Sequence, residues 1–294
     1  MMTDGLVQAE LIAVLVAVTS GQPRVLTIEG GHALPSGPLQ TGHRSLQSGL
    51  RAWVEQQTHH PLGYVEQLYT FADQNSGEPR GISISYLGLS REEKASYPNA
   101  IWRGWYDYFP WEDARSPSAG SGLISKALAR WAGGSSGRKS RVAALFGSDG
   151  EGWNEELVLQ RYELLWEAGL VPEARRGTET NGWVAPGLEM THDHRRILAT
   201  ALARLRSKIK YRPVVFELLP HEFTLLDLQQ TMEALAGQVF HKPNFRRFIE
   251  QLDLIEETGR MSAGLAGRPA KLFRFRQAIL AERSFAGTKL PIVK

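Results

Sequence analysis

Side chains that can bind nucleic acid stand close together in the last third of the chain: Lys242, Asn244, Arg246 and Arg247. An arginine can pair with guanine through two hydrogen bonds, and an asparagine can do the same with adenine. A helix is predicted over residues 244–252, and the N-terminal end of a recognition helix is the part that reaches base edges and phosphates. The pattern therefore predicts a DNA-reading helix. Its apolar residues are predicted to lie in the core: Phe245, Phe248, Ile249 and Leu252.

The elements around this helix predict a winged helix. Thr224, followed three residues later by Asp227, is close to a capping box, and its helix is predicted to end at Gly237. Residues 255–257 and 271–275 are predicted as two strands with a glycine-rich segment between them. Helix, turn, helix and β-hairpin is the order of a winged helix-turn-helix. We also count Thr224 among the candidate DNA contacts.

The predicted hairpin adds cations that suit the phosphates flanking a groove: Arg260, Arg268, Lys271, Arg274 and Arg276. We assign Arg268 and Lys271 to DNA contact. One or two of these cations, but not all, are expected to pair with acids nearby. The acids are Glu250, Asp253, Glu256 and Glu257.

Charge is distributed unevenly along the 294 residues. Residues 191–294 hold 18 Lys and Arg against 10 Asp and Glu, whereas residues 1–190 hold 16 against 21. A basic C-terminal third is typical of a protein with a polyanionic partner, although a solvated surface has the same composition. The absence of cysteine excludes disulfides and cysteine-based sites. The apolar run at 11–18 is too short to span a bilayer, so we predict no membrane association and a cytoplasmic, nucleoid-associated protein.

The N-terminal part is predicted to mix strands and helices. A helix is expected at 45–57, and strands are expected at 7–18, 24–28, 64–72 and 81–89, with a turn at Gln22-Pro23 between the first two. Residues 112–190 are predicted to form an insertion. It contains an amphipathic helix at 153–169 that suits dimerisation.

Two segments near the insertion could contact a nucleotide. Six aromatic residues lie between positions 102 and 111, and such rings can stack on a base, although they can equally form core or a dimer surface. Trp102 and Trp105 are the candidate ligand contacts among them. Gly133 to Ser140 suggests a phosphate loop, but Arg138 stands where the glycine before the lysine belongs. A flexible surface loop is the prediction for this segment.

The segment from Gly37 to His59 resembles the Nudix box, a loop and helix that hold Mg²⁺ against a diphosphate. Gly37 and Arg51 stand in their box positions, and Glu55 is the one carboxylate retained. The other acids of the box are replaced by His43, Ala52 and Gln56. Carboxylate oxygens are the ligands that Mg²⁺ requires, so one carboxylate is a poor metal site. The segment predicts a nucleotide sensor without catalytic or metal-binding residues, in which Arg51 and Glu55 contact the ligand.

The C-terminal part closely resembles the Nudix-related transcriptional regulators of NAD metabolism, and the degenerate box with the long insertion resembles their alphaproteobacterial branch. The matching segments are 192–194, 197–198, 205–211, 216–220, 223–225, 244–247 and 267–270. The resemblance implies an α+β protein. Residues 1–210 would form a Nudix-like α/β/α sandwich with the insertion around 112–190, and residues 211–294 would form the winged helix-turn-helix domain.

The resemblance also implies a function. It predicts a homodimeric repressor of NAD biosynthesis or salvage genes that binds double-stranded operator DNA. The effector would be NAD, ADP-ribose or ATP, with no cofactor required. The alternative is a divergent Nudix pyrophosphohydrolase acting on NAD or ADP-ribose, with metal ligands outside the box such as Glu29, Glu66 or Glu78. We favour the repressor, because the missing acids remove the usual metal site.

Overall fold

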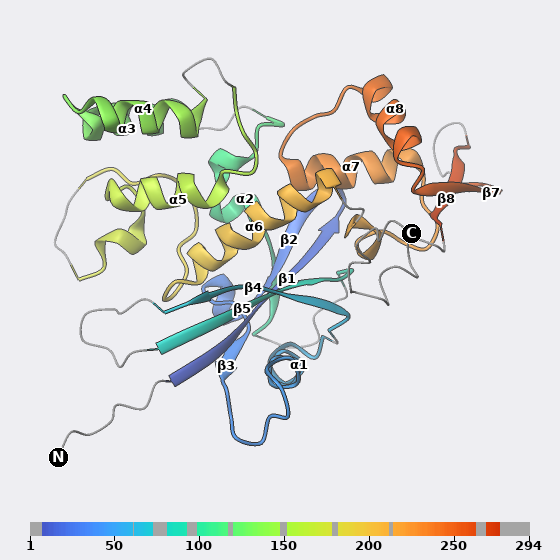
Figure 1. Cartoon of the computed structure of the whole chain (residues 1–294), viewed down its shortest axis with the longest axis horizontal. Coiled ribbons are helices and arrows are strands. Elements are labelled where there is room, and N and C mark those ends of the chain that lie inside the picture. The colour runs from blue at the N-terminus through green and yellow to red at the C-terminus, as the bar shows by residue number, and fades with distance from the viewer. Residues whose placement is uncertain are drawn as a thin grey trace, which may run out of the picture.

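A mixed β-sheet forms the centre of the molecule. The computed structural model describes residues 8–60, 62–72, 81–92, 99–116, 120–147, 152–177, 182–211, 214–262 and 269–276. The sheet has the strand order β4-β5-β1-β2-β6, and β3 pairs with β1 (Figure 1). Its strands are β1 (Gln8–Thr19), β2 (Gln22–Thr27), β3 (Ser36–Pro38), β4 (Tyr64–Phe71), β5 (Gly81–Leu89) and β6 (Ile101–Gly104). The four predicted strands are thereby confirmed.

The turn after β1 differs from the predicted one. Ser20 and Gly21 form it, with positive φ angles of 51° and 69°, as a two-residue hairpin requires. Pro23 does not lie in this turn, because it is part of β2 and stands opposite Val18 of β1. On its other side β1 runs parallel to β5.

Successive residues of β1 face two different layers. Val14 and its even-numbered neighbours pack in the larger core with α6 (His194–Tyr211) and α7 (Leu225–Ala236). Leu15 and its odd-numbered neighbours pack against α1 (Leu46–Thr58) on the opposite face. Because side chains alternate along a strand, one apolar run serves both layers. This arrangement confirms the predicted α/β/α sandwich.

Helices dominate the inserted region. The short 3₁₀ helix η1 (Glu29–Gly31) lies after β2, and α2 (Trp105–Tyr108) and η2 (Pro110–Glu112) follow β6 at the border of the inserted region. The inserted region contains α3 (Ser121–Ala132), α4 (Ser136–Phe146), α5 (Val158–Glu167) and η3 (Pro172–Arg175). The loop predicted at 133–140 is wrong beyond Ser135. The Ser135 hydroxyl caps α4 by accepting the Arg138 N–H at 3.3 Å, so a stretch rich in Gly and Ser becomes a helix start. The helix predicted at 153–169 begins later, at Val158.

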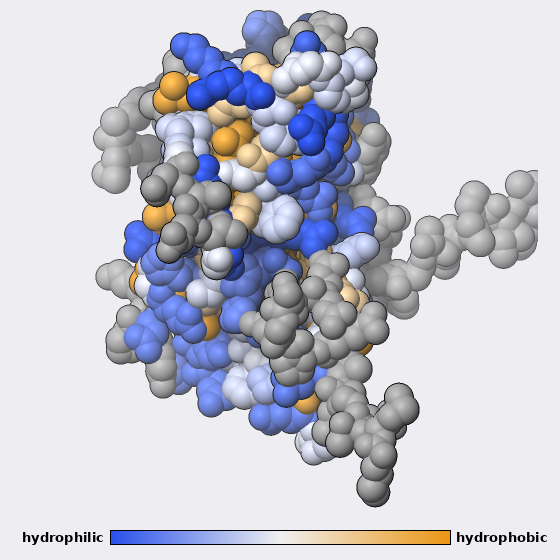
Figure 2. Space-filling model, turned by 90° about the vertical axis from the view of Figure 1, so that its left-hand side faces the viewer, coloured by the Kyte–Doolittle hydropathy of each residue, from blue (hydrophilic) through white to orange (hydrophobic). Residues whose placement is uncertain are grey.

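The side of the molecule that carries these helices is largely hydrophilic, with apolar residues in small separate patches (Figure 2). The role of the insertion in dimerisation stays a prediction.

The C-terminal elements have the predicted winged helix order. The 3₁₀ helix η4 (Val214–Glu217) leads from α6 to α7, and α8 (Lys242–Leu252) is followed by β7 (Ile255–Met261) and β8 (Lys271–Phe275). Phe223, before α7, exchanges two main-chain hydrogen bonds with Phe273 of β8, at 3.0 and 2.8 Å. The predicted domain border at residue 210 stays a prediction. None of the helices in the described ranges is both long enough and apolar enough to cross a membrane.

Candidate functional sites

The predicted DNA-reading helix is α8, which has one buried and one exposed face. Phe245 and Ile249, four residues apart, are buried in the core. Leu252, predicted to be core, is 37% exposed because it ends the helix. The four candidate DNA contacts are all exposed: Lys242, Asn244, Arg246 and Arg247.

The N-terminal end of α8 concentrates positive charge. Within the described part of the chain, Lys242 and Arg246 have no ion-pair partner. Arg247 donates to Oδ1 of Asn244 at 3.2 Å, which holds both side chains over the first turn. No acidic residue lies in this turn, and the N-terminus of a helix carries partial positive charge. The end of α8 is therefore suited to a phosphate or to the electronegative edge of a base.

The cations of the wing differ from those of α8, because they are paired. Each of the four described ones forms an ion pair, which exceeds the expected one or two: Arg260 with Glu222, Lys271 with Glu257, Arg274 with Glu256 and Arg276 with Asp253. Two of these pairs follow from cross-strand geometry, since Glu256 and Glu257 lie on β7 and their partners Arg274 and Lys271 lie on the facing strand β8. Exposed pairs contribute about 0–1 kcal/mol, so exchange of a carboxylate for a phosphate costs little. Arg268 lies outside the described residues.

Thr224 has a structural role at the start of α7. Its hydroxyl accepts the main-chain N–H of Asp227 at 3.2 Å, and the Thr224 N–H donates to the Asp227 carboxylate at 2.8 Å. This is a capping box, as the sequence predicts. The contact of Thr224 with DNA stays a prediction.

In the Nudix-like segment, the glycine and the helix of the box pack closely against each other. A Cβ atom on Gly37 would overlap the indole ring of Trp53 on α1, so only glycine lets β3 approach this helix. The indole Nε1 donates to the carbonyl of Pro38 at 3.0 Å, and Gln57 makes two hydrogen bonds with the main chain of Ser36, at 3.1 and 2.8 Å. The sequence did not predict these contacts, because Trp and Gln at these positions carry no motif.

Arg51 and Glu55 lie one turn apart on α1. The Arg51 guanidinium donates to the carbonyls of Leu62 and, at 3.0 Å, Gly63, so it holds the loop between α1 and β4. Glu55 is exposed. His43 accepts the main-chain N–H of Gln40 at 3.1 Å, which is a local structural role. Arg51 is thus partly occupied by the protein, whereas the Glu55 side chain faces solvent.

Of the residues proposed as alternative metal ligands, Glu29 and Glu66 belong to no possible metal cluster of described residues. Glu66 is ion-paired with Lys208 of α6, and Glu78 lies outside the described residues. Across the described ranges, no three or more His, Cys, Asp or Glu side chains are grouped so that they could hold a metal ion.

The two candidate stacking residues lie in the core. Trp102 is 7% exposed and packs edge-to-face on His60, with ring centroids 5.7 Å apart. Trp105 is 0% exposed, so its ring offers no surface to a ligand in this conformation. This burial corresponds to the core alternative that the aromatic pattern left open.

His194 joins the start of α6 to the loop before the box. Its Nδ1 accepts the main-chain N–H of Leu34 at 3.0 Å, so the neutral ring has its proton on Nε2. Burial, followed by the charges of His192 and Arg176, lowers the pKa of His194 to about 4. In the sequence, residues 192–194 stand out only by their resemblance to the family. The hydrogen bond could not be predicted, because Leu34 lies 160 residues from His194.

Comparison with known proteins assigns the C-terminal part. The family described as NrtR DNA-binding winged helix domain matches residues 215–275. The chain is 37% identical over 103 residues to the ADPR responsive transcriptional repressor NtrR of Acinetobacter baylyi. That match covers 33% of this chain and 40% of the repressor, so it spans less than half of either protein.

Solved structures share the fold of nearly the whole chain. Shewanella oneidensis NrtR complexed with a 27mer DNA matches with a TM-score of 0.57 and 22% identity, over 93% of this chain and 95% of that one. A MutT/nudix family protein from Enterococcus faecalis matches with a TM-score of 0.54 and 15% identity, over 94% and 89%. At these identities the likeness concerns the fold, which is that of a Nudix domain followed by a winged helix. Residues 215–275 therefore match the NrtR DNA-binding winged helix domain, and the chain as a whole shares the fold of Shewanella oneidensis NrtR, a Nudix domain followed by a winged helix.

Proposed function

We propose that this protein is a nucleotide-responsive transcriptional repressor of NAD biosynthesis or salvage genes. One observation carries the proposal: the exposed N-terminal end of α8, where Lys242 and Arg246 have no ion-pair partner among the described residues, lies within an NrtR-type winged helix. Unpaired cations at a helix N-terminus are suited to DNA. The similar repressor of Acinetobacter baylyi supports the assignment to repression.

ADP-ribose is the effector that we propose first, because the similar repressor is named as ADPR responsive. NAD and ATP are the other candidates. In this proposal the diphosphate lies over α1 near Arg51 and Glu55, where Arg51 supplies positive charge in place of a metal ion. The nucleotide acts by binding one arrangement of the DNA-reading helices better than another.

The proposed assembly is a homodimer on a palindromic operator. A two-fold dimer would place its two α8 helices in major grooves about one helical turn apart, or a multiple of it. We propose no enzymatic activity, since Ala52 and Gln56 replace box carboxylates on the exposed surface of α1.

Binding of double-stranded DNA from upstream of the protein's own gene tests the proposal. Fluorescence anisotropy should show a specific complex whose affinity falls as salt rises, with a slope of about 0.9 per phosphate contact. Titration with ADP-ribose, NAD, NADH, AMP and ATP, with and without Mg²⁺, identifies the effector by its shift of this affinity. Absence of a specific complex would exclude the repressor, and formation of AMP from ADP-ribose in Mg²⁺ would favour the hydrolase.

A further inference from the structure

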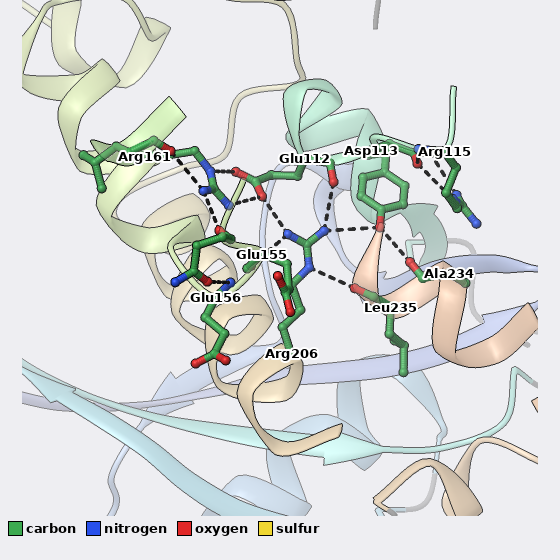
Figure 3. A network of polar contacts seen from close by, with 12 residues as sticks. Glu112, Asp113, Arg115, Glu155, Glu156, Arg161, Arg206, Ala234 and Leu235 are labelled. Carbon is green, nitrogen blue, oxygen red and sulfur yellow. Dashed lines mark hydrogen bonds and ion pairs between the residues drawn. The ribbon is translucent and has the colours of Figure 1, made fainter. Parts of the chain in front are cut away.

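The turn between α7 and α8 is held by the Nudix-like part of the chain, here called the nucleotide-binding domain after the function proposed for it. Three carbonyls at the end of α7 each accept a hydrogen bond from it (Figure 3 shows the first two). The Tyr106 hydroxyl donates to Ala234 at 2.6 Å, and Nε of Arg206 donates to Leu235 at 2.9 Å. The N–H of residue 114 donates to the carbonyl of Gly237 at 2.8 Å. The donors come from segments of the chain that precede the winged helix.

These bonds satisfy groups that a helix cannot satisfy by itself. The last four carbonyls of an α-helix have no partner within the helix. Gly237 ends α7 in the left-handed conformation, with φ of 69°. A Cβ atom there would overlap the carbonyl oxygen of Glu112, so the turn and the η2 segment are in backbone contact. The turn therefore fits against the nucleotide-binding domain without room for a larger residue.

The donors themselves are fixed in position. Arg206 also donates to the Glu112 carboxylate at 2.7 Å, to the Glu112 carbonyl at 2.9 Å and to the Glu155 carbonyl at 3.1 Å. The same carboxylate accepts two hydrogen bonds from Arg161, at 2.6 and 2.8 Å (Figure 3). The side chains of Glu112, Arg161 and Arg206 are all 0% exposed. A buried charge that lost its partner would be strongly destabilising, so this network resists rearrangement.

Tyr106 remains a donor at neutral pH. Burial raises its pKa above the ordinary value, chiefly by desolvation, so the hydroxyl keeps its proton. Tyr106 lies between two buried residues of the same short helix, Trp105 and Tyr108. The aromatic segment that packs into the nucleotide-binding domain is thus bonded directly to the end of α7.

We propose that Tyr106 and Arg206 are positioning residues for DNA recognition, because they fix the α7–α8 turn and with it the direction of α8. The inference rests on the proposed function, in which α8 reads DNA, the protein is a homodimer and a nucleotide is the signal. In each subunit, α8 then moves together with the nucleotide-binding domain. A nucleotide signal reaches DNA as a displacement of whole subunits and not as a bend between α7 and that domain.

The test compares three variants of the full-length chain: Tyr106→Phe, Arg206→Met and Arg161→Met. Arg161→Met is the matched control, since Arg161 binds the same buried carboxylate but has no hydrogen bond to α7 among those of the described residues. Amide hydrogen exchange over residues 234–249, unfolding midpoints and affinity for the operator are measured for each. Tyr106→Phe removes one oxygen atom and is expected to fold, which keeps the test valid if Arg206→Met does not.

We expect Tyr106→Phe to speed exchange in residues 234–249 roughly fivefold, as the loss of one buried hydrogen bond implies, and to weaken operator binding by a similar factor. Arg206→Met should have a larger effect at the same amides, whereas Arg161→Met should lower the unfolding midpoint without this local change. Exchange in 234–249 that is unchanged in Tyr106→Phe, or equal in the two arginine variants, overturns the proposal. Amide exchange is measured without DNA and does not depend on operator binding. If the wild-type protein bound no operator, the proposed repressor function would be refuted, but the exchange data would still show whether Tyr106 and Arg206 fix the α7–α8 turn.

Discussion

Helices α1 and α8 both carry arginines in positions suited to an anionic ligand, but their surroundings differ. Arg51 of α1 donates to two main-chain carbonyls of its own domain, and Gln57 of the same helix binds the main chain of Ser36 on β3. Arg246 of α8 is exposed and has no ion-pair partner among the described residues. The comparison teaches that residue type alone does not distinguish an arginine bonded to its own domain from an exposed arginine without an ion-pair partner.

The largest effect is expected from the double variant Lys242→Ala/Arg246→Ala. One base contact is worth about 1–3 kcal/mol, so with a phosphate contact also lost the operator affinity should fall roughly 100-fold. Anisotropy at several salt concentrations measures this loss and the smaller salt slope. Arg204→Ala, which removes an exposed cation of α6, is the control and should leave DNA affinity unchanged. Equal losses in both variants would show that α8 has no special role.

A second variant, His194→Asn, tests the buried contact between His194 and the main chain of Leu34, just before the box. His194 is neutral in the folded state down to about pH 4, but in the unfolded chain it binds a proton below about pH 6.5. The unfolded state therefore binds more protons between these values, and stability is lost as pH falls through this window. The loss from pH 7 to pH 5 should be about 2 kcal/mol in the wild type. An asparagine oxygen can still accept the Leu34 N–H, but asparagine does not titrate. The free energy of unfolding of the variant, measured with urea at several pH values, should therefore lack this loss of about 2 kcal/mol.

Arg51→Ala separates the two helices by function. We expect it to reduce the effect of ADP-ribose on operator affinity by about tenfold, the scale of a typical coupling between two sites. The affinity of the unliganded protein for DNA should stay within about twofold of wild type, because the hydrogen bonds of Arg51 within the described residues go to the carbonyls of Leu62 and Gly63, far along the chain from α8. An unchanged nucleotide response would place the ligand elsewhere than over α1.

The smallest effect is expected from Glu257→Gln in the wing. The substitution releases Lys271, whose ammonium group lies 2.8 Å from the Glu257 carboxylate. An exposed pair of this kind is worth less than about 1 kcal/mol, so operator affinity should rise by about twofold at low salt and by less at high salt. A decrease would mean that the pair itself holds the wing in its DNA-binding form.

Local signals in the sequence predicted most of the fold. Alternating or continuous apolar runs located the strands, and Thr224 and Gly237 located the two ends of α7. Helix α4 was missed because its first turn, with Ser136 and Gly137, has the composition of a loop. The helix is formed by a serine cap and by partly buried residues later in the segment, which composition alone does not reveal.

The contacts that join the two functional regions could not be predicted from the sequence. Arg206 lies 29 residues from Leu235, and Tyr106 lies 128 residues from Ala234. Arg206 belongs to a segment noted for its family resemblance and Tyr106 to the aromatic cluster, but neither pattern indicates a partner at the end of α7. Trp105 shows the converse: its residue type suggests a stacking surface, but the fold places it in the core.

The alternation of side chains along β1 has a practical consequence for dissecting the molecule. Val14 belongs to the layer of α6 and α7, whereas its neighbour Leu15 belongs to the layer of α1. Two truncations one residue apart, Val14→Ala and Leu15→Ala, would therefore leave cavities on opposite sides of the same sheet. Substitutions in this one strand can therefore perturb the layer of α6 and α7 and the layer of α1 separately.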